Sequence, residues 1–242
     1  MFFDQFEFDV RCEWGGHGVA VLAPHCDAIV IVDVLSFSTS VDVATQRGAL
    51  VFPYQGGFRQ AANFAASVNA HLAERHRSHN RFSLSPESLM RIPAGTRIVL
   101  PSPNGATLSL AANRTPVLAG CLRNAQAVAR AAQKFGSQIA VIPAGERWPA
   151  DQSLRPCFED LVGAGAIISY LSGRLAPEAA IALAAFQSVQ PALDEHLMRC
   201  SSGKELIERG YTEDVRLAAQ LNASDSAPIL RNGAFVRAGD QK

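Results

Sequence analysis

Two different hydrophobic patterns open the chain. Apolar and polar residues alternate over residues 6–14, and this period of two predicts a strand with one buried face, antiparallel or at a sheet edge. Residues 28–32 are instead a continuous apolar run of Ala, Ile and Val, which predicts a strand covered on both faces. The two segments therefore predict a sheet that carries helices on its faces at least around residues 28–32.

A unit of strand, small polar turn and helix then recurs down the chain. After residues 28–32, strands are predicted at 49–52, 97–100, 116–119 and 138–142. Helices are predicted up to Arg47 with Gly48 as the stop, and at 59–77, from 108 onward, 125–135, 158–171, 178–186, 192–200, 204–209 and 213–221. This alternation indicates a largely parallel sheet with helices on its faces.

The last strand signal is of another kind. Asn232-Gly233 lies between two apolar pairs in residues 229–236, which is a strong sign of a two-residue β-hairpin. The sheet is therefore predicted to be mixed. With 242 residues, 48% of them hydrophobic, the chain can bury one large core, and we expect a single α/β domain over residues 1–242, with two lobes as the alternative.

Charge and composition exclude several functions. The formal net charge is zero, so no overall field attracts nucleic acid or an anionic membrane. The longest apolar stretch, residues 161–173, is shorter than the roughly 20 residues of a membrane span, and the first residues lack a secretory pattern. The five cysteines form no C-x-x-C pair and predict reduced thiols. These features predict a cytoplasmic protein.

Small polar residues follow four of the predicted strands. In open α/β sheets, ligands bind outside the carboxyl ends of the strands, where free N–H groups at helix starts can bind an anion. Each turn taken alone could simply cap its helix, but four of them at one sheet edge favour a binding site. The residues are Asp33, Ser36, Ser38, Thr39 and Ser40; Ser102, Asn104, Gly105 and Thr107; Cys121, Arg123 and Asn124; and Gly145, Glu146 and Arg147.

Asp33 is the most informative of these residues. It ends the apolar run of residues 28–32, where a carboxylate is costly to bury unless it is paired or binds a metal ion. Mg²⁺ prefers carboxylate oxygens, so Asp33 beside hydroxyls and a helix start suits a site for Mg²⁺ and phosphate. Asp33 could be a metal ligand or attack phosphorus itself. The alternative is a residue that only caps the next helix.

Other charged residues could complete the site. Glu146 and Asp160 are candidate metal ligands with Asp33, and Glu159 and Asp160 are candidate catalytic carboxylates, although both could merely favour the start of the next helix. Arginines suit phosphate or sulfonate oxygens, and a solvated surface position is the alternative for each. The segment Ser201-Ser-Gly-Lys204 is a second candidate anion site. The candidate substrate-binding residues are Ser36, Ser38, Thr39, Ser40, Asn104, Gly105, Arg123, Asn124, Arg147 and Arg155.

The motifs of several well-known enzyme classes are missing. The sequence has no G-x-x-x-x-G-K-[ST] loop and no G-x-G-x-x-G after a strand. Asp33-Val-Leu is not the D-x-D of haloacid-dehalogenase-type phosphatases, no Cys is followed by Arg six residues later, and no H-E-x-x-H occurs. These gaps exclude the common nucleotide-binding and phosphatase classes that depend on those motifs.

Together, several segments resemble the 2-phosphosulfolactate phosphatase (ComB) family. Val32-Asp-Val-Leu-Ser-Phe-Ser-Thr-Ser40 resembles its D-V-L-R-A-T-T, and Ser102-Pro-Asn-Gly-Ala106 resembles its T-T-N-G-T. Gly120-Cys-Leu-Arg-Asn-Ala125 is similar to G-S-L-L-N-A, and Phe158-Glu-Asp-Leu161 to S-L-E-D. Residues 201–233 follow the closing pattern of the family, so the resemblance runs in order from about Asp33 to Phe235.

The resemblance implies a three-layer α/β/α sandwich and a Mg²⁺-dependent phosphatase for a small anionic phosphoester. The family substrate is 2-phospho-3-sulfolactate, on the route to coenzyme M. The chain departs from the family at Ser36, where the family has Arg, and at Pro103 and Ala106. Our hypothesis is that Arg123, Arg147 or Arg155 replaces the lost cation.

Some alternatives remain open from the sequence. Ser36 and Pro103 are compatible with a non-catalytic protein that binds an anionic metabolite on the same fold, and a related enzyme with other chemistry, such as a lyase, would share the site. A homodimer is an open alternative to a monomer.

Overall fold

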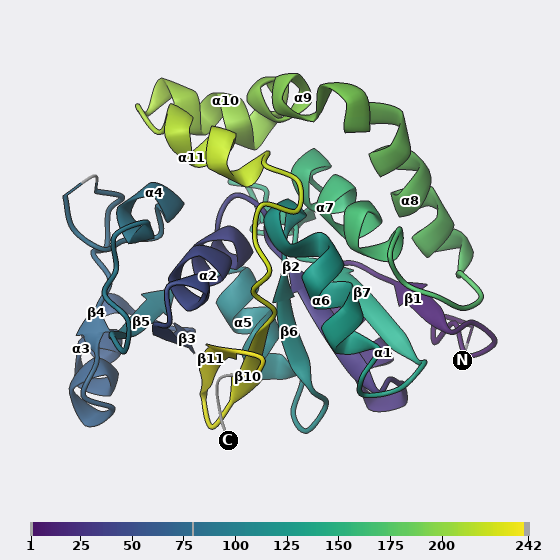
Figure 1. The fold of residues 1–242 in the computed structure, drawn as a ribbon, viewed down its shortest axis with the longest axis horizontal. Coiled ribbons are helices and arrows are strands. Elements are labelled where there is room, and N and C mark those ends of the chain that lie inside the picture. Colours follow the sequence, from purple (N-terminus) through teal and green to yellow (C-terminus); the bar gives the residue numbers. More distant parts are fainter. Residues whose placement is uncertain (1, 79, 240–242) are drawn as a thin grey trace.

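A mixed sheet of nine strands forms the centre of the protein (Figure 1). The structure is a computed structural model that describes residues 2–78 and 80–239. In sequence order the strands are β1 (Val10–Cys12), β2 (Ala28–Val32), β3 (Leu50–Tyr54), β4 (His71–Leu72), β5 (Arg97–Pro101), β6 (Val117–Gly120), β7 (Ile139–Pro143), β10 (Pro228–Arg231) and β11 (Ala234–Arg237). Their order across the sheet is β1-β7-β2-β6-β10-β11-β3-β5-β4.

Helices cover both faces of this sheet. Successive residues of β2 point to opposite faces: Ile29 and Ile31 join the core on one side, whereas Val30 and Val32 join the core on the other. The first core is covered by α1 (Gly15–Leu22), α2 (Phe37–Gln46), α4 (Pro86–Leu89) and α5 (Gly105–Ala111), and the second by α6 (Ala125–Ala132), α7 (Phe158–Ile168) and α8 (Pro177–Val189). The predicted α/β sandwich of three layers is confirmed.

The remaining helices lie at the margins of the sandwich. Helix α3 (Phe58–Ser67) packs on β3 and β5. Helices α9 (Leu193–Arg199), α10 (Ser201–Glu208) and α11 (Thr212–Ala218) continue from α8 as an arc along the top of the molecule in Figure 1. Within residues 2–78 and 80–239, every helix is too short or too polar to cross a membrane.

The C-terminal hairpin was predicted correctly, but its place in the sheet was not foreseen. β10 and β11 pair with each other and lie between β6 and β3, with antiparallel pairing at each step. β3, β4 and β5 therefore run opposite to β1, β2, β6 and β7. The carboxyl end of β5 therefore belongs to the reversed half, yet the turn after β5 still meets the turn after β2, as expected: the Gly105 N–H donates to Asp33 Oδ2 at 2.8 Å.

Several element boundaries differ from the sequence prediction. The first strand is at a sheet edge, as predicted, but it covers only Val10–Cys12 and is parallel to β7. β3 continues through Pro53, although proline has no N–H to donate to a neighbouring strand. The Leu50 N–H points toward β5, so the nitrogen of Pro53 points to the other side, toward β11. β11 pairs with β3 only at Val51, so no hydrogen bond is lost at Pro53. The helix predicted over residues 59–77 ends at Ser67.

Three short elements were missed. After α3, Asn69 takes a positive φ of 49°, and the chain then adds β4 to the edge of the sheet. Helix α4 lies between the predicted helix 59–77 and the predicted strand 97–100, where the sequence predicted no element. The predicted loop after β7 contains a separate hairpin of β8 (Glu146–Arg147) and β9 (Leu154–Arg155). Each of these elements is too short for periodicity to show it.

Candidate active site

Asp33 lies immediately after β2 and joins the starts of two helices. Its Oδ1 accepts a hydrogen bond from the Phe37 N–H at 3.0 Å, and its Oδ2 accepts one from the Gly105 N–H at 2.8 Å. These are the first residues of α2 and α5, so the capping alternative for Asp33 is correct as geometry. Only 6% of Asp33 is exposed, and burial is the main cause that raises its pKa, against the lowering effect of the two N–H groups.

The hydroxyl groups at the start of α2 hold this turn together. Ser38 Oγ donates to the Ile31 carbonyl and accepts from the Asp33 N–H, and Thr39 Oγ1 donates to the Val34 carbonyl at 2.7 Å. Ser40 Oγ donates to the Leu84 carbonyl. All three hydroxyls are buried and serve the backbone, so the structure shows them fixing Asp33, and their predicted contact with substrate stays a prediction.

Asp160, on another helix, also fixes the turn after β2. It lies in the first turn of α7, where Oδ1 accepts from the Val34 N–H and Oδ2 from the Gly145 N–H, both at 2.8 Å. Burial first, and then the charges of Asp33 and Glu159, raise its pKa well above the ordinary value. Its predicted roles in catalysis and metal binding are untested, while its hydrogen bonds tie the loops after β2 and β7 together.

A cavity of about 250 Å³, here called the Asp33 cavity, opens beside this carboxylate. Both acidic side chains and arginines line it. Its lining residues are Asp33, Leu35, Ser36, Arg75, His76, Arg77, Leu84, Ser102, Pro103, Asn104, Glu146, Ser202, Glu205, Leu206 and Arg209. Five of the residues that the sequence predicts at the ends of strands, Asp33, Ser36, Ser102, Asn104 and Glu146, therefore meet here.

Glu146 and Asn104 connect the β8 strand to the start of α5. The Asn104 side-chain amide donates from Nδ2 to Glu146 Oε2 at 2.9 Å. Burial, followed by the negative charge of Asp33, raises the pKa of Glu146 to about 7. The charge of Asp33 thus disfavours ionisation of Glu146 in the same cavity, and a cation between such carboxylates would be stabilised.

This donor set fits a magnesium ion of the usual kind. Among the described residues, no group of three or more His, Cys, Asp or Glu side chains is close enough to hold a metal ion. Mg²⁺ commonly needs only one or two carboxylates, with waters and substrate phosphate as the other ligands. Asp33 and Glu146 line one cavity and would supply those two carboxylates, whereas Asp160 does not line it. Asp33, like Asp160, already accepts a backbone N–H at each oxygen.

Glu159, Arg155 and Arg147 do not line the Asp33 cavity. Glu159 and Arg155 line a neighbouring cavity, and Arg155 Nη2 is 3.5 Å from Ser202 Oγ. Arg147 is exposed on the β8–β9 hairpin, where Nη1 donates to the Gln152 carbonyl. Arg155 is thus near enough to the site to act at its margin, and Arg147 is directed along its own hairpin.

Arg123 and Asn124 belong to a different part of the molecule. Arg123 Nε donates to Asp42 Oδ2 at 3.0 Å in a buried ion pair, and its Nη1 reaches Gln220. Asn124 Oδ1 accepts from the Cys121 N–H. The structure does not bring either side chain into the Asp33 cavity, because the turn after β6 packs against α2 and α11.

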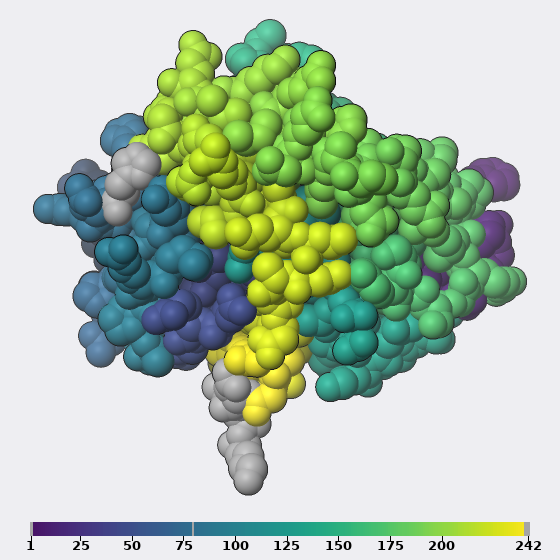
Figure 2. Space-filling model, turned by 45° about the horizontal axis from the view of Figure 1, so that its top comes forward, coloured from purple at the N-terminus to yellow at the C-terminus, as the bar shows by residue number. Residues whose placement is uncertain are grey.

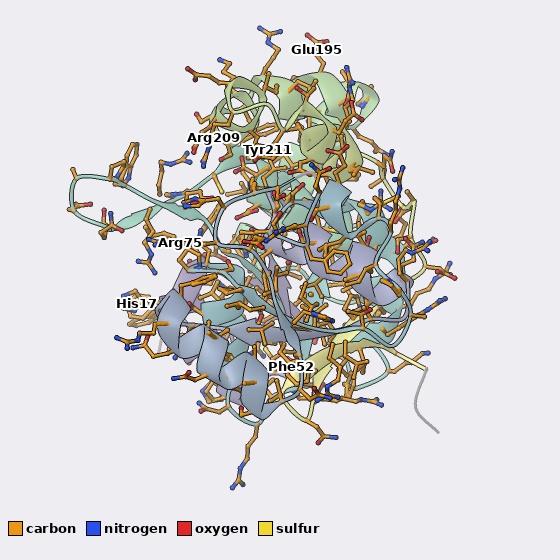
Figure 3. The ribbon with its side chains drawn as sticks, turned by 90° about the vertical axis from the view of Figure 1, so that its left-hand side faces the viewer. His17, Phe52, Arg75, Glu195, Arg209 and Tyr211 are labelled. Atoms are coloured by element: carbon orange, nitrogen blue, oxygen red, sulfur yellow. The ribbon has the colours of Figure 1, made fainter. Side chains whose placement is uncertain are left out.

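The arginines of the cavity were not singled out from the sequence. Arg75 and Arg77 follow β4, and Arg209 ends α10. Figure 3 shows Arg209 and Tyr211 close together above Arg75. No sequence signal could have selected Arg75 and Arg77, since both fall in the segment expected to be the polar end of a long helix.

The segment Ser201–Lys204 proves to be part of the same region. α10 begins there, and Cys200 Sγ accepts from the Gly203 N–H at the helix start. Ser202 lines the Asp33 cavity and Ser201 the neighbouring one. The predicted second anion site thus lies beside the first site and shares its wall.

Comparison with known proteins agrees with this arrangement. The family model described as 2-phosphosulpholactate phosphatase matches residues 22–233. A probable 2-phosphosulfolactate phosphatase of Carboxydothermus hydrogenoformans is 30% identical over 86% of this chain and 89% of its own length. The 2-phosphosulfolactate phosphatase of Methanothermobacter thermautotrophicus is 30% identical over 57% of this chain and 58% of its own. The chain therefore belongs to the 2-phosphosulpholactate phosphatase family of phosphoric monoester hydrolases.

Proposed function

We propose that this protein is a Mg²⁺-dependent phosphatase that hydrolyses a small anionic phosphoester, 2-phosphosulfolactate or a close analogue. The observation that carries the proposal is the lining of the Asp33 cavity, where Asp33 and Glu146 occur together with Arg75, Arg77 and Arg209. Such a cavity offers a cation site and an anion site side by side, which is what a metal-assisted phosphatase needs.

Asp33 and Glu146 would hold the magnesium ion. When bound, Mg²⁺ would offset the negative charge that develops on the phosphoryl oxygens. The hydrogen bonds to Phe37, Gly105 and Asn104 fix the two carboxylates before any ligand binds. Fixed polar groups of this kind lower the reorganisation needed during the reaction.

The arginines would bind and orient the substrate. Forked guanidinium groups match the oxygens of phosphate, carboxylate and sulfonate, all of which occur in the proposed substrate. Ser202 and Ser102 add hydroxyl groups to the same wall. Glu159 and Asp160 are buried at the start of α7. Asp160 would support the loops of the site through its hydrogen bonds to Val34 and Gly145, and Glu159 would help to position the attacking water.

Two chemical routes fit this geometry. Asp33 could attack phosphorus and form a phosphoenzyme, or it could serve the metal while water attacks directly. Labelled water distinguishes them: exchange of the label into inorganic phosphate in the absence of net turnover requires reversible phosphoryl capture. Asp33→Asn would abolish that exchange if Asp33 is the nucleophile.

A phosphate-release assay tests the proposal. The wild-type protein should release inorganic phosphate from 2-phosphosulfolactate with Mg²⁺ and stop when EDTA is added. Tight binding of phosphoesters without release of phosphate under any metal would instead support a non-catalytic binding protein. Release that EDTA does not affect would contradict the metal dependence.

The setting of the reaction is also part of the proposal. The five cysteines are free, as expected in a reducing compartment, and we propose a cytoplasmic enzyme. The proposed substrate would place the reaction on the route to coenzyme M that the family resemblance implies. A homodimer is proposed as one possible assembly, and sedimentation velocity would test it.

A further inference from the structure

Arg77 is held in the wall of the Asp33 cavity by contacts from three segments. Its Nη1 donates to Asp214 Oδ2 at 2.8 Å and to the Leu84 carbonyl at 3.0 Å. Its Nη2 donates to Ser36 Oγ at 2.9 Å, and its guanidinium lies over the ring of Tyr211 at 5.7 Å. The side chain is 12% exposed, so it is fixed and yet open to the cavity.

These contacts leave part of the guanidinium group available. Within residues 2–78 and 80–239, the Nε–H and the second hydrogen of Nη2 have no protein acceptor. Asp214 balances the charge of Arg77, but its Oδ1 is already engaged by the Ser85 hydroxyl and the Glu87 N–H. The positive charge of Arg77 also acts on Asp33, whose pKa it lowers against the larger raising effect of burial.

The neighbouring arginines differ from Arg77 in how they are held. Arg75 is exposed and has no hydrogen-bond or ion-pair partner among the described residues. Arg209 pairs with Glu205 on the surface of α10, with 56% of its side chain exposed. Arg77 is therefore the guanidinium group of the cavity that is already positioned, whereas the other two must lose side-chain entropy to bind a ligand.

We propose that Arg77, oriented by Ser36, Asp214 and Tyr211, is the residue that binds the phosphoryl group of the substrate in this protein. The inference rests on the proposed function for the identity of the ligand, but it makes a separate claim about which side chain holds the anion. Ser36 then has a positioning role, since its hydroxyl accepts from Nη2 of Arg77 and both residues line the cavity.

Binding of inorganic phosphate to the wild-type protein, measured by isothermal titration calorimetry with Mg²⁺ present, tests this claim without turnover. The test variant is Arg77→Gln combined with Asp214→Asn, which removes both charges and so leaves no unpaired buried carboxylate. The matched control is Arg81→Gln with Glu74→Gln, because that pair is similarly close, at 2.9 Å, and lies near Arg77 in the chain but is exposed.

The test variant should bind phosphate about 10- to 100-fold more weakly than wild type, which is the usual effect of losing a charge-assisted hydrogen bond. The control should bind as wild type does. Equal affinity in the test variant and wild type would overturn the proposal. Circular dichroism and thermal unfolding show whether the variants are folded.

Arg77→Lys provides the measurement if the double variant does not fold. Lysine keeps the positive charge beside Asp214, but it lacks the planar guanidinium group, which can donate to Ser36 and to a ligand in the cavity at the same time. Weaker phosphate binding by this variant supports the proposal, and unchanged binding overturns it.

The experiments can separate a failure of the role proposed for Arg77 from a failure of the proposed phosphatase function. If wild-type protein binds phosphate through Arg77 but releases none from any phosphoester, the function fails and the role of Arg77 stands. If turnover is seen and Arg77 variants keep wild-type affinity for phosphate, the function stands and the role of Arg77 fails.

Discussion

At the scale of single residues, the site is built from carboxylates that the protein keeps out of water. Burial is the leading cause of the raised pKa of Asp33, Glu146 and Asp160, and the charge of Asp33 raises the pKa of the other two further. Backbone N–H groups or the Asn104 amide offset part of that cost. Buried carboxylates of this kind lower the stability of the folded protein, and they form a site where binding of a cation would be favourable.

The pKa of Glu146 leads to a prediction about stability and pH. It is raised from 4.5 to about 7 in the folded protein, so the folded state binds this proton more tightly than the unfolded state. The free energy of unfolding in EDTA should therefore fall as pH rises from about 4.5 to about 7. Thermal unfolding at pH 5.5 and pH 8 measures the fall.

Glu146→Gln is the matched variant, since it keeps the shape of the side chain and removes the charge. The difference in melting temperature between the two pH values should be smaller in this variant. Added Mg²⁺ should raise the melting temperature of the wild type at pH 8 more than at pH 5.5. An equal change in melting temperature in wild type and variant would contradict the claim that ionisation of Glu146 causes the fall in stability.

Arg123 leads to a second prediction at this scale. Its removal would leave Asp42, whose side chain is fully buried, with only neutral partners such as Ser224. Arg123→Ala should lower the free energy of unfolding by about 3 to 5 kcal/mol, as loss of one partner of a buried pair does. Chemical denaturation measures this, with Arg216→Ala as a control at an exposed pair on α11.

The KM of Arg123→Ala, measured where the variant is folded, distinguishes this role from substrate binding. We expect a KM equal to that of wild type, because Arg123 does not line the Asp33 cavity. A higher KM with unchanged stability would instead support the hypothesis that Arg123 compensates for Ser36.

Asp33 could be predicted from the sequence and Arg77 could not, for a physical reason. A carboxylate at the end of a wholly apolar strand must be compensated, and that need is visible in the local sequence. Arg77 is held in the cavity wall by hydrogen bonds to Ser36 and Asp214, which are 41 and 137 residues away in the sequence. Pairings over such separations depend on the fold, and no local pattern encodes them.

At the scale of elements, the approach of α5 to β2 shapes the site. The Gly105 N–H reaches Asp33 because no side chain stands between them: a Cβ at this glycine would lie 2.3 Å from Phe37 Cδ1 and 2.8 Å from Asp33 Oδ2. The glycine thus lets the starts of α2 and α5 share one carboxylate.

Gly105→Ala should therefore weaken both the fold and the site. We expect a loss of about 1–3 kcal/mol, as for other overpacked positions, together with lower phosphatase activity. Gly16→Ala is the control, because its Cβ would meet only Leu108 Cδ2, at 3.9 Å. Wild-type stability and activity in Gly105→Ala would show that the close approach is not needed.

The elements themselves were predictable where they are long or strongly patterned. β2, α7 and the C-terminal hairpin follow from apolar runs and from Asn232-Gly233. β4 and the β8–β9 hairpin have strands of only two residues, held by pairing with a neighbouring strand rather than by local preference. The sequence therefore predicted the layers of the fold but not the segment that carries Arg75 and Arg77.

At the scale of the whole molecule, the C-terminal hairpin joins two halves of opposite strand direction. Figure 2 shows this part of the chain as a yellow strip that runs between the blue region and the teal and green region. β10 contacts β6 and β11 contacts β3, with Phe235 buried in the core that α2 also covers. The relation between the halves, and hence the meeting of Asp33 with Gly105, depends on this insertion.

A substitution in the turn of the hairpin should therefore destabilise both halves of the sheet. Gly233 has a φ of 81°, so Gly233→Val forces a β-branched residue into the left-handed region, at a cost of about 1–3 kcal/mol. Amide hydrogen exchange should become faster in β2 and in β5 together. Faster exchange in only one of them would indicate that the two halves are stable independently.

The most direct test of the account is Mg²⁺-dependent release of phosphate from 2-phosphosulfolactate by wild type and by Asp33→Asn. We predict release by the wild type that EDTA stops, and a loss on the order of 10³-fold or more in the variant, as for removal of a group on which the chemistry depends. Folding of the variant is checked by circular dichroism. Turnover by a folded Asp33→Asn at the wild-type rate would contradict the central claim that Asp33 is the centre of the active site.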